Sequence, residues 1–150
     1  VLEGSAPRFF RRLAEGVFDE ADLKRRTDEL AEFVLWARER YGLPAPLALG
    51  FSNGANIAAA LLQQRPEILA GAALLRAMVP FVEVSEADLA GKPVLILSGA
   101  LDPIVPKTDA EALACRLSGS GATVEHRMLP AGHGLGQADI GLLKDWLAHR

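Results

Sequence analysis

The sequence predicts an α/β fold: a parallel sheet of about four strands with helices on both faces. Short apolar segments alternate with longer helix-favouring segments, which is the pattern of βαβ units. One of these transitions, residues 50–54 (G-F-S-N-G), places a G-x-S-x-G motif between an apolar run and an alanine-rich run. This is the strand–turn–helix setting that the motif requires. With 150 residues, the chain is long enough to bury a core, and we expect a single domain over residues 1–150.

Composition narrows the classes of function. Half of the residues are hydrophobic and 23% are charged, as in globular proteins. The net charge of -3, without a long basic run, predicts neither a nucleic acid nor an anionic membrane as partner. No apolar run has the length of a membrane span and no signal peptide opens the chain, so we expect a cytoplasmic protein. The single cysteine, Cys115, excludes an internal disulfide, and we expect it to be a small buried side chain of a helix.

The first part of the chain predicts one long helix. We expect residues 1–18 to be irregular and to pack aromatic side chains on the domain. Asp19 begins the helix, with Asp22 at the spacing of a capping box. Apolar residues recur every three or four positions until Gly42 provides a stop.

The G-x-S-x-G segment predicts a sharp turn between a strand over residues 46–49 and a helix over 55–64. The turn brings backbone atoms close together, so we expect a Cβ at Gly50 or Gly54 to clash. Ser52 then lies at a helix N-terminus, where free N–H groups and the helix dipole favour a developing oxyanion. The alternative is that both glycines are ordinary turn residues and that Ser52 caps the helix.

The rest of the chain predicts three more strands and two helices. The strands are expected over residues 70–77, 93–97 and 123–129, the last at an edge of the sheet, and the helices over 108–117 and from residue 137. Ligands of an open parallel sheet bind beyond the carboxyl ends of its strands. Ser52, Asp102 and His133 each follow such an end.

These three residues predict nucleophilic catalysis. A serine hydroxyl is a weak nucleophile, so His133 would take its proton and later deliver it to the leaving group. Asp102 would hold the imidazole in the required tautomer and stabilise the imidazolium. Two of these assignments have alternatives. Asp102 could form a turn, with Asp109 as the fallback acid, and His126 more naturally packs within a strand. Three scattered histidines form no metal-ligand cluster, so we expect no metal.

Several segments together resemble the phospholipase/carboxylesterase family of α/β-hydrolases, which is related to acyl-protein thioesterases and dienelactone hydrolases. They are residues 7–19 (PRFFRRLAEGVFD), 50–59 (GFSNGANIAA), 78–80 (MVP), 98–106 (SGALDPIVP) and 130–135 (PAGHGL). The resemblance implies hydrolysis of a carboxylic ester or thioester through an acyl-enzyme, without a cofactor. Dienelactone hydrolases use cysteine at the position of Ser52, which favours the esterase side.

One feature of that family is missing. Its members carry further N-terminal strands and a histidine-glycine motif that supplies a second oxyanion donor, so we expect a truncated hydrolase domain. Only the Asn53 N–H can be assigned as a donor here. The strand over 46–49 should then lie at the border of the sheet, with its free edge covered by residues 1–18 or by a second copy in a homodimer.

The same topology predicts the substrate pocket. The apolar loop that follows the second strand should wall the acyl site with Met78, Val79 and Phe81. Phe9 and Phe10 are candidates for the opposite wall. An apolar acyl group would then be preferred to a charged one.

Three functions compete. The first is a serine ester or thioester hydrolase that acts on a small molecule. The second is a catalytically impaired hydrolase fragment that serves as an interaction module, pairing its incomplete sheet with another chain. The third is an acyltransferase or lyase on the same fold.

Overall fold

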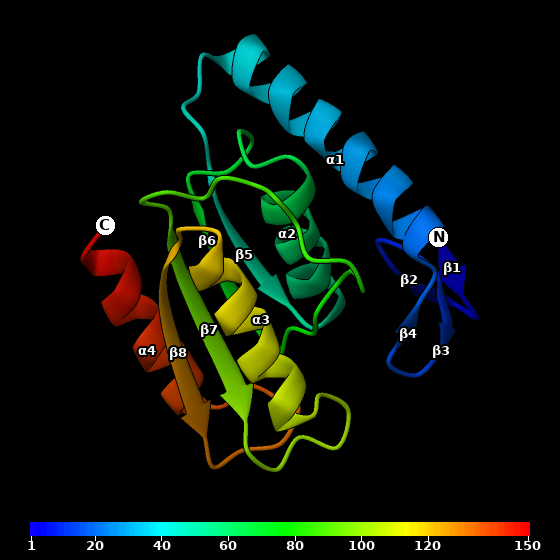
Figure 1. Ribbon diagram of the computed structural model, residues 1–150, viewed down its shortest axis with the longest axis vertical. Coiled ribbons are helices and arrows are strands. Elements are labelled where there is room, and N and C mark those ends of the chain that lie inside the picture. Colours follow the sequence, from blue (N-terminus) through cyan, green and yellow to red (C-terminus); the bar gives the residue numbers. More distant parts are fainter.

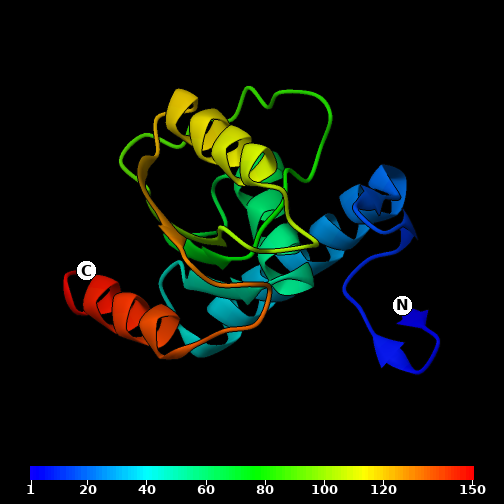
Figure 2. The same cartoon turned by 90° about the horizontal axis from the view of Figure 1, so that it is seen from below.

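The computed structural model describes residues 1–150 and contains one four-stranded parallel sheet in the order β5-β6-β7-β8. Its strands are β5 (Leu47–Phe51), β6 (Gly71–Leu75), β7 (Pro93–Gly99) and β8 (Thr123–Leu129). The helices are α1 (Glu20–Tyr41), α2 (Asn53–Gln64), α3 (Lys107–Gly119) and α4 (Gln137–Ala148). Helices α3 and α4 lie on opposite faces of the sheet (Figure 2). The predicted fold class is therefore confirmed, with a four-stranded sheet and helices on both faces.

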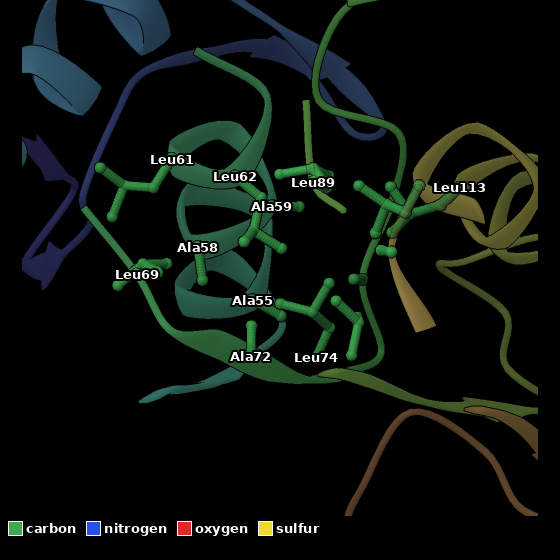
Figure 3. Close-up of a cluster of buried hydrophobic side chains, with 14 of the residues drawn as sticks. Ala55, Ala58, Ala59, Leu61, Leu62, Leu69, Ala72, Leu74, Leu89 and Leu113 are labelled. Carbon is green, nitrogen blue, oxygen red and sulfur yellow. The ribbon is translucent and has the colours of Figure 1, made fainter. Parts of the chain in front are cut away.

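Alternate residues of the buried strands supply two separate cores. Ala72 and Leu74 of β6 face α2 and α3, in a cluster that also takes in Ala31 of α1 (Figure 3). Ala73 and Leu75 point the other way, toward Leu143 and Trp146 of α4. This alternation follows from the two-residue period of a strand. Because all four strands are parallel, their carboxyl ends lie at one edge of the sheet.

Helix α1 begins and ends where the sequence indicates. Asp19 is the N-cap residue, and its Oδ1 accepts a hydrogen bond from the Asp22 N–H at 3.1 Å. Gly42 ends the helix in the left-handed conformation, with φ 63°. The reciprocal half of the capping box does not form, since Asp22 Oδ2 accepts from the Arg11 N–H at 2.8 Å instead. Asp22 therefore ties the N-terminal segment to α1.

Residues 1–18 contain more order than the sequence suggests. They form two antiparallel hairpins, β1 (Leu2–Glu3) with β2 (Ala6–Pro7) and β3 (Arg12–Ala14) with β4 (Val17–Phe18). Gly4 and Gly16 make the turns with φ of 60° and 72°, which glycine adopts without strain. The carboxylate of Glu3 pairs with both Arg8 and Arg12, so it links the two hairpins. The expectation of irregular structure was therefore wrong for these strands.

Strand β5 lies at the border of the sheet and pairs only with β6, as predicted (Figure 1). Its side chains at positions 47, 49 and 51 are exposed, and Leu49 most of all at 61%. Residues 1–18 form no ladder with this edge. Pro7 and Phe9 instead line a cavity of about 550 Å³ alongside it. The edge therefore presents unpaired backbone groups beside an apolar surface.

The exposure of Cys115 contradicts the expectation that it is buried. Helix α3 buries Ala110, Leu113 and Leu117, which are spaced three and four residues apart. Position 115 falls on the other side of this helix, since each residue turns by about 100°. None of the four helices combines the length and the apolarity that a membrane crossing requires.

Candidate active site

The turn between β5 and α2 holds Ser52 in a strained conformation. Its φ of 52° and ψ of -115° lie in a region that residues with a Cβ rarely adopt, at a cost on the order of 1–3 kcal/mol. The Ser52 N–H donates to the Leu75 carbonyl at 2.8 Å, which ties the turn to the end of β6. The Ser52 side chain makes no capping hydrogen bond to α2. Ser52 therefore occupies the N-cap position of α2, but its side chain does not cap the helix as the alternative interpretation expected.

The two glycines of the motif differ in whether a side chain would fit at their positions. A Cβ at Gly50 would lie 2.5 Å from both the Ala55 nitrogen and the Gly54 oxygen, so only glycine fits. A Cβ at Gly54 would meet nothing closer than the Phe9 ring, at 3.6 Å, which is ordinary van der Waals contact. The expected clash at Gly54 is therefore wrong. Its Cβ position points outward from the first turn of α2, toward a side chain and not toward backbone.

We expect Gly50→Ala to destabilise the protein by at least about 2 kcal/mol, because backbone atoms must move to admit the methyl group. The matched control is Gly54→Ala, which leaves stability unchanged or raises it, since alanine favours a helix over glycine by about 1 kcal/mol. Urea unfolding followed by circular dichroism measures both. Equal losses of stability in the two variants would contradict this account of the turn.

The structure brings Ser52, His133 and Asp102 into one chain of hydrogen bonds. His133 Nε2 lies 2.9 Å from Ser52 Oγ, and His133 Nδ1 lies 2.9 Å from Asp102 Oδ2. Each residue follows a different strand, β5, β8 and β7 respectively. Since a carboxylate only accepts, the proton on Nδ1 points to Asp102, and Nε2 is left free to accept the serine proton. The Asp102 side chain is fully buried, whereas the His133 side chain is 20% exposed.

Hydrogen bonds keep Asp102 ionised. Burial acts to raise the pKa of this carboxyl group. Hydrogen bonds from the N–H groups of Val105 and Ile104 and from His133 lower the pKa by more than burial raises it. Ile104 and Val105 donate to Oδ1 at 2.8 and 3.0 Å, and His133 lies against Oδ2. The net effect is a pKa below the ordinary value of an aspartate. Asp102 is therefore an anion at neutral pH, facing the imidazole.

Asp109 and the two other histidines of the chain, His126 and His149, lie away from Ser52. Asp109 Oδ2 accepts from the Val79 N–H at 2.7 Å, so it anchors the loop after β6. His126 Nε2 lies 2.7 Å from Ser98 Oγ on the neighbouring strand, and burial lowers the pKa of its ring. His149 Nδ1 lies 2.6 Å from the Asp145 carbonyl at the end of α4. None of them replaces Asp102 or His133 beside Ser52.

Asn53 is placed to donate a hydrogen bond beside Ser52. It is the first residue of α2, so its N–H has no carbonyl partner within the helix. Its side-chain Oδ1 is occupied by the Phe9 N–H at 2.8 Å. The backbone N–H of Asn53 and the N-terminal dipole of α2 therefore remain available for an anion.

The side chains expected to wall a substrate pocket fall into different environments. Val79 and Phe81 line a cavity of about 380 Å³ together with Phe18 and other residues. Met78 is mostly buried, and its N–H donates to Asn56 Oδ1 at 2.8 Å, which ties this loop to α2. Phe9 is 51% exposed and lies against Gly54.

The expectation that Phe10 lines the pocket is wrong. Its side chain is fully buried and packs edge to face on Phe18, with ring centroids 5.0 Å apart. Phe10 belongs to a buried cluster with Leu23, Ile57 and Phe81, whereas the neighbouring Phe9 is half exposed, so the two rings do not face one cavity.

Sequence reasoning missed two residues of the site. Phe51 places its ring 5.3 Å from that of His133, and its position directly before Ser52 was the available signal. Arg76 is completely buried behind the loop that carries His133. A single charge inside the apolar run of residues 71–79 was the signal for Arg76.

Comparison with known proteins gives matches over most of the chain. The profile of the alpha/beta hydrolase fold matches residues 11–91. MhqD of Bacillus subtilis (strain 168), which is named as a hydrolase, is 43% identical over 148 residues, covering 97% of this chain and 74% of that protein.

Two solved structures named as carboxylesterases superpose closely. The Bacillus cereus carboxylesterase is 44% identical, with a TM-score of 0.96 over 99% of this chain and 71% of its own. The carboxylesterase from Mesorhizobium loti is 35% identical, with a TM-score of 0.93 over 100% of this chain and 72% of its own.

Proposed function

Because this chain belongs to the alpha/beta hydrolase fold family, we propose that it is a serine hydrolase of carboxylic esters or thioesters that acts through an acyl-enzyme. The observation that carries the proposal is the continuous chain of hydrogen bonds from Ser52 through His133 to Asp102. A strained serine, an imidazole within hydrogen-bond reach of it and a buried carboxylate at one sheet edge are what acyl transfer to a hydroxyl needs. The carboxylesterases that superpose on the chain support the same reaction class.

In the proposed acylation step, Ser52 Oγ attacks the carbonyl carbon of the substrate while His133 Nε2 accepts the hydroxyl proton. Asp102 stabilises the imidazolium that forms. The negative charge on the carbonyl oxygen develops near the Asn53 N–H and the N-terminus of α2. The tetrahedral intermediate collapses, and the alcohol or thiol leaves with the proton from His133.

Deacylation repeats these steps with water as the nucleophile. His133 takes a proton from the water, whose oxygen attacks the acyl carbon, and then returns the proton to Ser52 Oγ. The products are the free acid and the regenerated serine. Every proton transfer uses the Nε2 face of the imidazole, which requires that Nδ1 stays bonded to Asp102.

We propose an uncharged, apolar acyl group as the preferred substrate part. Phe51 lies beside His133, and Phe9 lies against Gly54, next to Asn53. The loop with Met78, Val79 and Phe81 is anchored next to this site through Asn56, whose own N–H donates to the Ser52 carbonyl. Val79 and Phe81 line a cavity that does not include Ser52, so Phe51 and Phe9 carry this proposal. A charged acyl group would lose hydration beside these two rings without gaining a partner.

A fluorophosphonate probe tests the proposed chemistry. We expect one covalent adduct per chain, located at Ser52 by peptide mass mapping, and hydrolysis of p-nitrophenyl esters with apolar acyl chains. Heat-unfolded protein is the control, since labelling requires the assembled site. The unpaired edge of β5 favours the interaction module as the second candidate. A folded protein that neither reacts with the probe nor cleaves any ester would support that candidate against the hydrolase.

A further inference from the structure

Arg76 is an unusual residue of the fold because it is charged, fully buried and strained. It follows β6 directly, its exposure is 0%, and its φ is 56°. Ser52 is the other residue of the chain that has a positive φ and is not glycine. Strained residues of this kind cluster at functional sites. The conformation of Arg76 therefore calls for an explanation in terms of what its side chain holds.

The guanidinium of Arg76 joins three parts of the molecule. It forms a bidentate pair with Asp139 of α4, at 2.8 and 3.0 Å. Its Nε donates to the Gly132 carbonyl at 2.9 Å and its Nη2 to the Gly134 carbonyl at 3.2 Å. Its Nη1 also lies 3.2 Å from the Leu97 carbonyl at the end of β7. Gly132 and Gly134 are the two neighbours of His133 in the chain.

Asp139 completes the clamp on this loop. Besides pairing with Arg76, its Oδ2 accepts a hydrogen bond from the Gly136 N–H at 2.8 Å. The pair therefore holds the carbonyls of residues 132 and 134 and the N–H of residue 136. On the other side, the loop presses against Gly99, where a Cβ would lie 2.4 Å from the Ala131 oxygen. The backbone that carries His133 is thus held from two directions.

The same turn also contacts the nucleophile. The Leu75 carbonyl, in the peptide unit directly before Arg76, accepts the Ser52 N–H at 2.8 Å. One short segment at the end of β6 therefore fixes the backbone of Ser52 and, through a side chain, the loop of His133. A buried ion pair is weak evidence for stability, since apolar replacements of similar volume are often as stable. Its hydrogen bonds to the backbone on both sides of His133 give it a different use.

We propose that Arg76, clamped by Asp139, is a positioning residue that sets the place of His133 relative to Ser52. The inference rests on the proposed function of the Ser52 site. Arg76 acts only through the loop, since its side chain is fully buried behind it. A misplacement of reacting groups by about 1 Å lowers the rate roughly 100-fold, so small movements of this loop have large consequences.

Two variants test the proposal by different routes. Arg76→Lys keeps the positive charge but cannot form the forked contacts, so we expect kcat to fall about 10- to 100-fold with KM within threefold. The double variant Arg76→Met/Asp139→Leu removes both charges together, which preserves folding if a single substitution does not. We expect it to show the same fall in kcat.

The control must separate positioning from a general loss of stability. Leu117→Ala truncates a fully buried side chain in the last turn of α3, at the opposite end of the sheet from His133. We expect it to lower the melting temperature by as much as the Arg76 variants or more, with kcat unchanged. Activity is compared well below every melting temperature.

A second readout does not depend on catalysis. The proton shared by His133 Nδ1 and Asp102 should give a far-downfield proton NMR signal that the Leu117→Ala variant keeps and both Arg76 variants lose or broaden. If both Arg76 variants keep the signal and the wild-type kcat, the proposal is overturned. If the wild-type protein shows the signal but reacts with no ester or probe, the proposed function fails, while loss of the signal in the variants would still establish the positioning role.

Discussion

Replacing Ser52 by alanine is expected to lower kcat for ester hydrolysis by about 10⁴-fold or more, because it removes the atom that attacks the carbonyl in the proposed mechanism. His133 and Asp102 keep each other as partners, so the fold should be retained. The measurement is the steady-state hydrolysis of a p-nitrophenyl ester that the wild-type protein cleaves. It is combined with intact mass after fluorophosphonate treatment, which should show no adduct.

The matched control for this prediction is Ser118→Ala, an exposed serine in the last turn of α3. It should retain full activity and full labelling. A Ser52→Ala protein that is folded and still cleaves the ester at more than a few per cent of the wild-type rate would show that another group is the nucleophile. Mapping the adduct in that protein would then identify it.

Asp102→Asn is expected to lower kcat by about 10³- to 10⁴-fold, although the side chain keeps its size. The amide can donate to Nδ1, which would leave the proton on Nε2, the wrong nitrogen for accepting from Ser52. It also removes the negative charge that stabilises the imidazolium in the proposed mechanism. Asp109→Asn is the comparison, because Asp109 anchors the Val79 N–H and makes no contact with His133. Activity lost equally in both variants would return Asp109 to consideration as the acid.

The lowered pKa of Asp102 also predicts how stability depends on pH. A carboxyl group whose pKa is lower in the folded state stabilises the protein fully above its unfolded pKa, about 3.9. This contribution is lost as the pH falls through the lower folded value. The difference in unfolding free energy between the wild-type protein and Asp102→Asn should therefore be constant near neutral pH and shrink in acid. Urea unfolding at neutral and acidic pH measures it, and a difference that grows on acidification would contradict the assignment.

Most of the fold can be predicted from local sequence signals. The strand over residues 123–129 and the stop at Gly42 follow from hydrophobic pattern and turn chemistry, and the structure reproduces both. Ser52, Asp102 and His133 could also be selected, because strand order alone brings the ends of parallel strands to one edge. The distances between them depend on how the loops pack, which topology alone does not give.

Other features depend on contacts between residues that are far apart in the sequence. The strict need for glycine at position 50 but not at 54 comes from the path of α2 over β5. The burial of Phe10 and the exposure of Cys115 depend on which side of each segment faces a neighbour. Local sequence predicts the type of an element better than its rotation about its own axis.

By itself, the sequence determined the class of fold, the position of the turn at Ser52 and the three side chains that meet there, because each rests on contacts between near neighbours or on strand order. Only the tertiary structure decided that Arg76 is buried against Asp139, 63 residues further along the chain, and holds the loop around His133. In the sequence, Arg76 is one charge in an apolar run. Its role depends on a partner from α4, on the opposite side of the sheet from α2, and such a pairing is set by packing between distant segments and not by any local preference.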